Sequence, residues 1–123
     1  MISLIFASLL LAGQQPDCSD PQTQADMNQC AGREAAEADA DLNLIYKEVV
    51  AHYEQMDRDS ESTEGVKRLR AAQRAWVAFR DAQCSLAGYE ALGGSMETLL
   101  VAGCEAELTK RRAAELHMML SGR

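Results

Sequence analysis

The sequence predicts an all-α protein, a small antiparallel helical bundle of about three helices that two disulfides cross-link. Apolar residues recur at spacings of three, four and seven along extended stretches of the chain, as they do on one face of a helix. Aromatic residues make up only 5% of the sequence, whereas Ala, Leu and Glu are abundant, so the core must consist mainly of aliphatic side chains. Four cysteines frame these stretches, an arrangement typical of small exported domains.

The first 13 residues are expected to be a signal peptide, and residues 14–123 a single domain. The segment MISLIFASLLLAG carries no charged side chain and ends in small residues. It is shorter than the roughly 20 apolar residues of a membrane-spanning helix, so we expect no stable membrane anchor after cleavage. A lipid anchor is not expected either, because Gln14 occupies the position where a lipoprotein signal has its cysteine. The mature protein is therefore expected to be periplasmic or secreted.

The first helix is expected to end near Met56. It can begin at Asp20-Pro21, because Pro suits the first helical turn, or at Thr23, a residue type that caps helices. Its apolar residues form one stripe: Ala31, Ala35, Ala38, Leu42, Ile45, Val49 and Met56. The polar segment 57–65, DRDSESTEG, interrupts this pattern and predicts a connection.

The second helix is expected over about Glu64 to Leu86, with Ser62 or Thr63 as its cap. One face carries its main apolar residues: Val66, Leu69, Ala72, Trp76 and Phe79. Trp76 is the only tryptophan of the chain. Helical spacing alone explains it as a core residue rather than as a surface anchor for a partner.

A glycine-containing connection at 88–95 is expected before the third helix. Gly93 and Gly94 permit backbone angles that other residues avoid, and Ser95 can cap the helix that follows. The third helix is expected to continue almost to Gly122. Its apolar residues are Leu99, Leu100, Cys104, Leu108 and Leu116, with Met118, Met119 and Leu120 at its end.

The four cysteines are expected to form two disulfides. If the first two helices form an antiparallel hairpin, Cys30 and Cys84 lie at the same end of it, and the third helix begins at that end as well. We therefore predict the pairs Cys30–Cys84 and Cys18–Cys104, although the sequence permits three pairings. A metal site is not expected, because the chain has no C-x-x-C and neither histidine is near a cysteine pair.

The sequence contains no recognisable catalytic constellation and no cofactor motif, so we predict a protein that is not an enzyme. His52 has Glu48 one helical turn before it, but no serine or cysteine nucleophile is placed to use that pair. Glycine loops that hold phosphates are also absent from the sequence.

Four strings of the sequence carry a resemblance to a known family. They are ADADLNLIY at 38–46, LRAAQRAWVAFRDAQC at 69–84, GGS at 93–95 and CEAELTKRRAAEL at 104–116. The most specific run is Q-x-x-W-x-x-[FY]-R-D-x-x-C, here Gln73, Trp76, Phe79, Arg80, Asp81 and Cys84. Together the strings resemble the LprI-like lysozyme inhibitor domain family of exported bacterial proteins. The resemblance implies an α-helical domain with paired cysteines and, for characterised relatives, inhibition of lysozyme.

Most of the matching positions are interpreted as structural. They are Asn43, Tyr46, Gln73, Trp76, Phe79, Arg80, Asp81 and Arg112. Trp76 would fill the core, as would Leu42. Asn43, Gln73 and Arg80 flank apolar stripes, so we expect them to hydrogen-bond between helices or to pair with carboxylates such as Asp39 or Asp81. The alternative is that Arg80 or Asn43 points outward and contacts a partner.

The net charge of −7 is unevenly distributed and bears on the kind of partner. Residues 17–64 hold thirteen acids and three bases, whereas residues 66–90 hold five bases and two acids. An acidic protein repels nucleic acid and attracts cationic proteins. Lysozymes of the animal type are strongly cationic, so the charge agrees with a lysozyme as the partner. A solvated acidic face that serves solubility is the alternative explanation.

Two connections are candidates for contact with such a partner. A blocker of a muramidase cleft, where paired carboxylates flank the bond, needs a protruding element. The 85–95 connection offers Tyr89, Gly93, Gly94 and Ser95, and the 57–65 turn offers Asp57, Asp59 and Glu61. The predicted function is an exported inhibitor that binds lysozyme non-covalently and without a cofactor. The alternative is a small envelope binding, assembly or immunity module with another protein partner.

Overall fold

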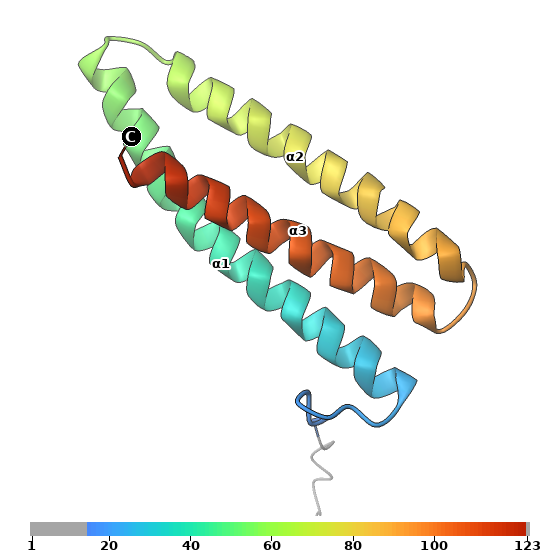
Figure 1. The fold of residues 1–123 in the computed structure, drawn as a ribbon. Coiled ribbons are helices and arrows are strands. Elements are labelled where there is room, and N and C mark those ends of the chain that lie inside the picture. The colour runs from blue at the N-terminus through green and yellow to red at the C-terminus, as the bar shows by residue number, and fades with distance from the viewer. Residues whose placement is uncertain (1–14, 123) are drawn as a thin grey trace, which may run out of the picture.

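Three long helices make up the computed structural model, which describes residues 15–122 (Figure 1). They are α1 (Gln24–Asp59), α2 (Glu64–Gly88) and α3 (Met96–Leu120), and a short 3-10 helix, η1 (Tyr89–Ala91), follows α2. No strand occurs among these residues, so the predicted all-α fold is confirmed. The predicted signal peptide at 1–13 lies outside the described residues. Over residues 15–122 no helix combines the length and the apolar character that a membrane crossing requires.

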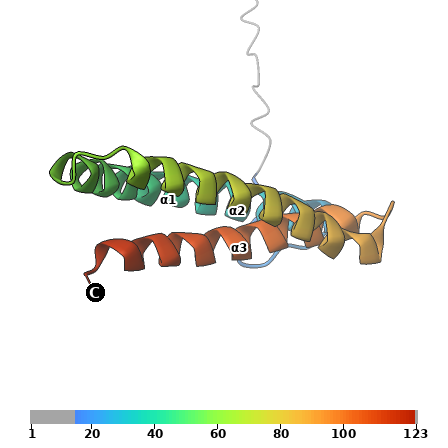
Figure 2. The same ribbon diagram turned by 90° about the horizontal axis from the view of Figure 1, so that it is seen from above.

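The chain runs up, down and up again, so that α3 is parallel to α1 and α2 is antiparallel to both (Figure 1). α3 packs against both other helices, and its contact with α1 is the most extensive. α1 and α2 meet mainly near the turn that joins them and diverge away from it (Figure 1). Seen from above, α3 lies on one side of α1 and α2 (Figure 2). The divergence leaves much of α2 covered by α3 alone.

Thr23, one of the two predicted starting points, caps α1, because its Oγ1 accepts a hydrogen bond from the Asp26 N–H at 3.0 Å. α1 ends at Asp59, a few residues beyond the predicted end at Met56. Asp57 lies in this added segment. Its two carboxylate oxygens accept the N–H groups of Gly65 and Val66, at 2.8 and 3.0 Å. An acid on the last turn of α1 therefore caps the first turn of α2.

Ser95 does not cap α3, contrary to the prediction. Its φ of −68° and ψ of −20° are already helical, and its side chain makes no capping hydrogen bond. Glu97 in the first turn of α3 instead ties the helix to the preceding connection, because its carboxylate accepts the N–H of Gly93 at 2.9 Å. Gly93 has a φ of 78°, a left-handed conformation that suits glycine. The expected backbone freedom is therefore used at Gly93, whereas the predicted cap at Ser95 is wrong.

The core has two halves of different chemistry. Toward the 60–63 turn lies a cluster of large aliphatic side chains, Leu42, Ile45, Val49, Leu69 and Leu116, against which Trp76 and Tyr46 pack. In the other half the buried residues are mostly small and include Ala31, Ala38, Ala102 and Ala106. Alanines remove little apolar surface from water, so they contribute less free energy of burial than leucines do. Both disulfides lie in this alanine half.

The predicted disulfide pairing is wrong. The structure joins Cys18 to Cys30 and Cys84 to Cys104, with Cα–Cα distances of 5.5 and 5.4 Å. Measured from the shared turn, Cys30 lies roughly 44 Å along α1, whereas Cys84 lies only roughly 30 Å along α2. A disulfide cannot span that offset, since its Cα atoms are at most about 7 Å apart. The pairing error thus follows from the greater length of α1.

The predicted core face of α2 is only partly buried. Leu69 is buried and Trp76 packs against the core, but Ala72 is exposed and Phe79 is 55% exposed. At this level α1 has diverged and reaches α2 through the Asp39–Arg80 ion pair, so α3 provides most of the cover of α2. The apolar residues of α2 occupy a wider arc than one neighbouring helix can cover.

Candidate partner-binding surfaces

One end of the molecule brings together the chain around the start of α1 and a connection that is distant in sequence. The segments are the N-terminal arm 15–23, the first turns of α1, and the 89–95 connection before α3. The Cys18–Cys30 disulfide fastens the arm to α1. The Asn28 side chain donates a hydrogen bond from Nδ2 to the carbonyl of Ser95, at 2.9 Å, and so joins α1 to the connection. We call this the disulfide end.

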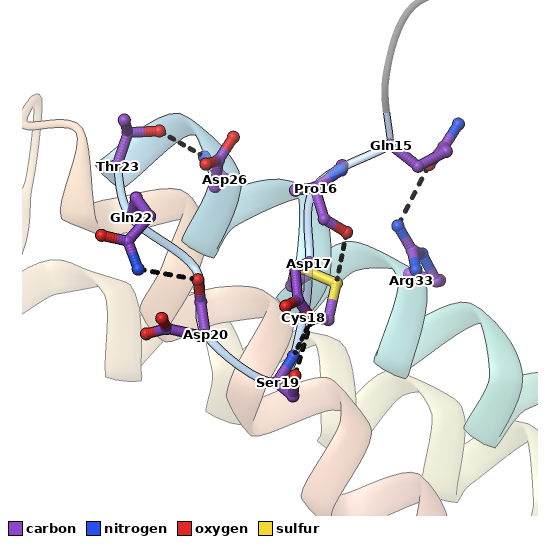
Figure 3. The surroundings of a disulfide bond; sticks show 11 residues. Gln15, Pro16, Asp17, Cys18, Ser19, Asp20, Gln22, Thr23, Asp26 and Arg33 are labelled. Carbon is purple, nitrogen blue, oxygen red and sulfur yellow. Dashed lines mark hydrogen bonds between the residues drawn. A yellow bond between two sulfur atoms is a disulfide. The ribbon is translucent and has the colours of Figure 1, made fainter.

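The arm has a defined conformation (Figure 3). Asp17 accepts hydrogen bonds from the N–H and the hydroxyl of Ser19, at 3.0 and 2.6 Å. These two bonds lower the pKa of the Asp17 carboxyl, because they favour its charged form. Arg33 of α1 donates to the Gln15 side chain at 3.0 Å. The arm therefore lies against α1 and contributes to the surface there.

Large apolar side chains stand in solvent at the disulfide end. They are Leu86, Tyr89, Leu92 and Met96, which are 63%, 67%, 68% and 48% exposed. Gly93 and Gly94 lie between the last two and are exposed as well. An exposed apolar cluster of this kind is typical of an interaction site.

A groove begins at the disulfide end and follows the seam between α1 and α3. It consists of two hollows of about 620 and 440 Å³, which share Ala38, Asp41 and Lys110 in their walls. Its apolar lining includes Ala31, Ile45, Leu99, Ala113 and Ala114. The groove is therefore apolar along its length, and charged side chains form its rim.

The rim on the α1 side is a row of exposed carboxylates. It comprises Glu34, Glu37, Asp41 and Glu48, whose spacings of three, four and seven place them on one face of the helix. Lys110 of α3 forms an ion pair with Glu34. α1 as a whole carries nine acids and three bases. The acidic character of the protein is thus concentrated on the helix that borders the groove.

The acidic 57–65 turn lies at the opposite end of the molecule from the 85–95 connection (Figure 1). α2 alone separates them by roughly 36 Å. Asp57 is engaged in capping α2, and Asp59 accepts a hydrogen bond from Gln55 at 2.8 Å. Glu61 has a φ of 51°. One enzyme cleft cannot receive both candidate loops.

Arg80 connects all three helices at the alanine half of the core. Its side chain is 17% exposed, and its Nη1 lies 3.6 Å from the Asp39 carboxylate on α1 and 3.5 Å from the buried Thr109 hydroxyl on α3. Its Nε donates to Asp81 at 3.0 Å, and its guanidinium lies 5.2 Å from the centre of the Trp76 ring. These contacts fix the position of each helix along its axis relative to the other two.

A second polar contact joins α2 to α3, two turns from Arg80 along α2 and one turn from Thr109 along α3. Arg112 donates from Nε to the Gln73 side chain at 3.0 Å and pairs with Glu115 at 2.9 Å. Asn43, for which an interhelical role was predicted, is instead exposed on α1. Phe79 is likewise exposed. The predicted structural set therefore includes three residues that do not join helices, Asn43, Phe79 and Asp81, the last of which pairs with Arg80 of its own helix.

The comparison with protein families agrees with this geometry. The family model described as Lysozyme inhibitor LprI matches residues 17–116. This range contains most of the arm, both disulfides, nearly all of the groove lining and most of α3. The chain belongs to the LprI family.

Two relatives of this LprI family member share part of its sequence. Uncharacterized protein R02472 from Rhizobium meliloti (strain 1021) is 46% identical over 111 residues, which cover 86% of the chain and 80% of the relative. Uncharacterized protein YecT from Escherichia coli (strain K12) is 36% identical over 72 residues, which cover 55% of the chain and 44% of the relative. No solved structure matches the chain.

In this LprI protein four of the six residues of the specific motif run lie along one side of α2. Gln73, Trp76, Arg80 and Cys84 follow each other at spacings of three, four and four, and each contacts α3 or packs on the core. The family name denotes an inhibitor and not an enzyme. His52 is exposed and its ring meets Tyr53 edge on, at 5.4 Å between ring centres. No cluster of metal-binding side chains occurs within 15–122.

The groove and its row of acids were not predicted. The spacing of Glu34, Glu37, Asp41 and Glu48 is visible in the sequence, and it indicates an acidic face of the first helix. Whether such a face borders a groove depends on which helix lies beside it. The sequence predicted α2 as the neighbour of α1, whereas α3 has the more extensive contact.

Proposed function

We propose that this protein is an exported inhibitor of lysozyme that binds the enzyme non-covalently and covers its cleft, which protects peptidoglycan. Its membership of the LprI family supports the inhibitory role. Its two disulfides support a location outside the cytoplasm, because disulfides persist in oxidising compartments. The proposed signal peptide at residues 1–13 agrees with such a location.

The observation that carries the proposal is an uncharged loop at the end of a groove whose α1 rim is acidic. Residues 91–96, ALGGSM, carry no charge, and the Asn28 hydrogen bond holds Ser95 beside α1. Lysozyme acts through paired carboxylates on either side of the scissile bond. They repel an acidic loop but not an uncharged one. Leu92 and the bare backbone of Gly93 and Gly94 can therefore approach the floor of the cleft.

The row of acids on α1 has the complementary task of attracting the enzyme. Glu37 and Asp41 are exposed on the rim of the groove, where they can face basic residues around a lysozyme cleft. Charges of opposite sign accelerate association and fix the orientation of the partners. The lysozyme would then lie over the groove with its cleft on the 91–96 loop.

The other predicted contact residues have different places in this arrangement. Gly93, Gly94 and Ser95 belong to the loop itself, and Tyr89 lies at its edge on the α2 side. Asp57, Asp59 and Glu61 lie at the far end, about 36 Å from the loop. Their carboxylates add to the overall field but do not touch the enzyme.

The test is inhibition of cell-wall hydrolysis by animal-type, goose-type and invertebrate-type lysozymes at two salt concentrations. The oxidised protein should inhibit at least one class stoichiometrically, and less strongly at high salt. The double reversal Glu37→Lys with Asp41→Lys should raise the inhibition constant about tenfold at low salt. Leu92→Asp should abolish inhibition at both salt concentrations, because it places a carboxylate in the cleft.

A matched control separates the groove from net charge. Glu54→Lys with Glu61→Lys changes the charge by the same amount, at exposed positions away from the disulfide end. This control should inhibit nearly as well as the unchanged protein. Equal losses in both double variants would mean that net charge alone matters. No inhibition by any correctly folded form would favour an envelope binding, assembly or immunity module.

A further inference from the structure

α2 carries a continuous apolar stripe that the rest of the described chain leaves uncovered. Its residues are Ala72, Ala75, Phe79, Ala82, Leu86 and Tyr89, and all six are exposed. They follow each other at spacings of three, four, three, four and three, the a/d spacing by which two helices interlock. Tyr89 continues the stripe, since its φ of −60° and ψ of −32° extend the helical path. We call this set the α2 stripe.

The α2 stripe is separate from the packed side of the helix. Gln73 and Arg80 reach α3 on that other side, and Cys84 is fully buried there. The three large members of the stripe, Phe79, Leu86 and Tyr89, are 55%, 63% and 67% exposed. Small exposed residues, Ala71, Ala78 and Ser85, flank the stripe on one side. A second helix can therefore approach α2 closely along its length.

We propose that the α2 stripe binds the same stripe of a second copy of this chain, with the two α2 helices antiparallel. In an antiparallel pair centred between residues 80 and 81, the six positions form three kinds of layer. Ala72 lies opposite Tyr89, Ala75 opposite Leu86, and Phe79 opposite Ala82. Each layer thus combines one alanine with one large side chain. Such layers fill space evenly, as packed interfaces require.

The parallel alternative fits poorly. Each residue would then face its own copy, so the Phe79, Leu86 and Tyr89 layers would be crowded. The three alanine layers would leave gaps, and both defects cost free energy. Both arrangements have a twofold axis, but only the antiparallel one places a small side chain opposite a large one in every layer.

Charge also favours a second antiparallel copy. Residues 64–74 at the beginning of α2 carry four bases and one acid, Glu64, which pairs with Lys67 and Arg68. Residues 81–97 toward the other end carry three acids and no base. Antiparallel pairing places the basic end of one copy beside the acidic end of the other, which is attractive. The pair also leaves the α1–α3 groove open, because no residue of α2 lines it. The proposal therefore does not depend on the proposed inhibitory function.

The first test is sedimentation equilibrium of the oxidised protein from micromolar to millimolar concentration. We expect a monomer–dimer equilibrium. Phe79→Glu would bury a carboxylate in two layers of the dimer, so it should raise the dissociation constant by about a hundredfold. Met118→Glu is the matched control, since it replaces a 69% exposed apolar side chain of α3 outside the stripe. The control should leave the dissociation constant unchanged.

A swap of two side chains tests the register. Ala82→Phe places Phe opposite Phe, and Phe79→Ala places Ala opposite Ala, so each single variant should weaken the dimer. Phe79→Ala combined with Ala82→Phe restores a small and a large residue in each layer and should recover most of the affinity. Circular dichroism checks that all variants fold.

Three outcomes would overturn the proposal. The first is a monomer at all concentrations. The second is stronger association of Ala82→Phe, which indicates unspecific adhesion. The third is loss of lysozyme inhibition in Phe79→Glu with a monomeric parent protein, which assigns the α2 stripe to the enzyme. A dimer that does not inhibit lysozyme would instead support this proposal and contradict only the proposed function.

Discussion

Asp57 shows how one side chain joins two helices. Its carboxylate accepts the first free N–H groups of α2 from Gly65 and Val66, which would otherwise lack partners at the start of a helix. A Cβ atom on Gly65 would lie 2.6 Å from the same carboxylate, too close for two non-bonded atoms. The acid and the glycine therefore act as one unit at the 60–63 turn.

We predict that Asp57→Ala lowers the free energy of unfolding by about 1 to 2 kcal/mol, the usual contribution of a helix cap. Asp59→Ala removes a neighbouring exposed acid and should change it by less than about 0.5 kcal/mol. Urea denaturation followed by the fluorescence of Trp76 measures both values. Similar losses in the two variants would mean that charge and not capping matters at this turn.

Urea denaturation also measures the energetic coupling between Asp57 and Gly65. Gly65→Ala should destabilise the unchanged protein, because the methyl group displaces the carboxylate from its two hydrogen bonds. In the Asp57→Ala background Gly65→Ala should be nearly neutral, because no carboxylate remains to be displaced and alanine is a better helix former than glycine. Additive effects would show that the two residues do not act as a unit.

At the scale of the elements, periodicity predicted the helices well. The stripe from Ala31 to Val49 and the cap at Thr23 are local features, and local features suffice to place a helix. Helix ends were less accurate where a side chain acts across a turn, as Asp57 does. Pairing between elements depends on their lengths and on which neighbours they have, so the disulfides and the groove could not be predicted.

The same distinction applies to the candidate contact residues. Sequence reasoning selected Gly93 and Gly94 because their backbone freedom is a local property. It also selected the acids of the 57–65 turn, which lie too far from the 91–96 loop to share a cleft. It placed Phe79 on the apolar face of the second helix and interpreted it as structural, because periodicity shows that a residue lies on an apolar face but not whether another helix covers that face.

We predict that the two disulfides contribute unequally. Cys84→Ala with Cys104→Ala should lower the free energy of unfolding by about 3 to 4 kcal/mol, from loop closure and from a cavity at the buried Cys84. Cys18→Ala with Cys30→Ala should cost less, because Cys18 is exposed and its disulfide only fastens the arm. Urea denaturation of both variants decides this. Equal losses would mean that loop entropy alone governs stability.

The whole molecule is stabilised by different means in its two halves. Large aliphatic side chains around Val49 and Leu116 hold the half near the 60–63 turn. Alanines and both disulfides hold the half that carries the 91–96 loop. The loop and the nearby part of the groove therefore depend on oxidation more than the rest of the fold does.

Reduction should accordingly loosen one half before the other. We predict that, in reduced protein, amide hydrogen exchange accelerates along residues 84–104 while the amides near Val49 and Leu116 keep most of their protection. Hydrogen exchange with mass spectrometry on oxidised and reduced protein makes the comparison. A uniform rise in exchange would show that the halves unfold as a single cooperative unit. Inhibition should decline together with the protection of residues 84–104.

The connectivity of the cysteines has a consequence for how the protein is made. Each disulfide joins cysteines that are neighbours in the order of the sequence, Cys18 to Cys30 and then Cys84 to Cys104. A chain that reaches an oxidising compartment from its N-terminus presents the first pair together, and the second pair only afterwards. An oxidase that links thiols as they emerge would thus form the native bonds directly. Maturation should need no isomerase to rearrange mispaired cysteines.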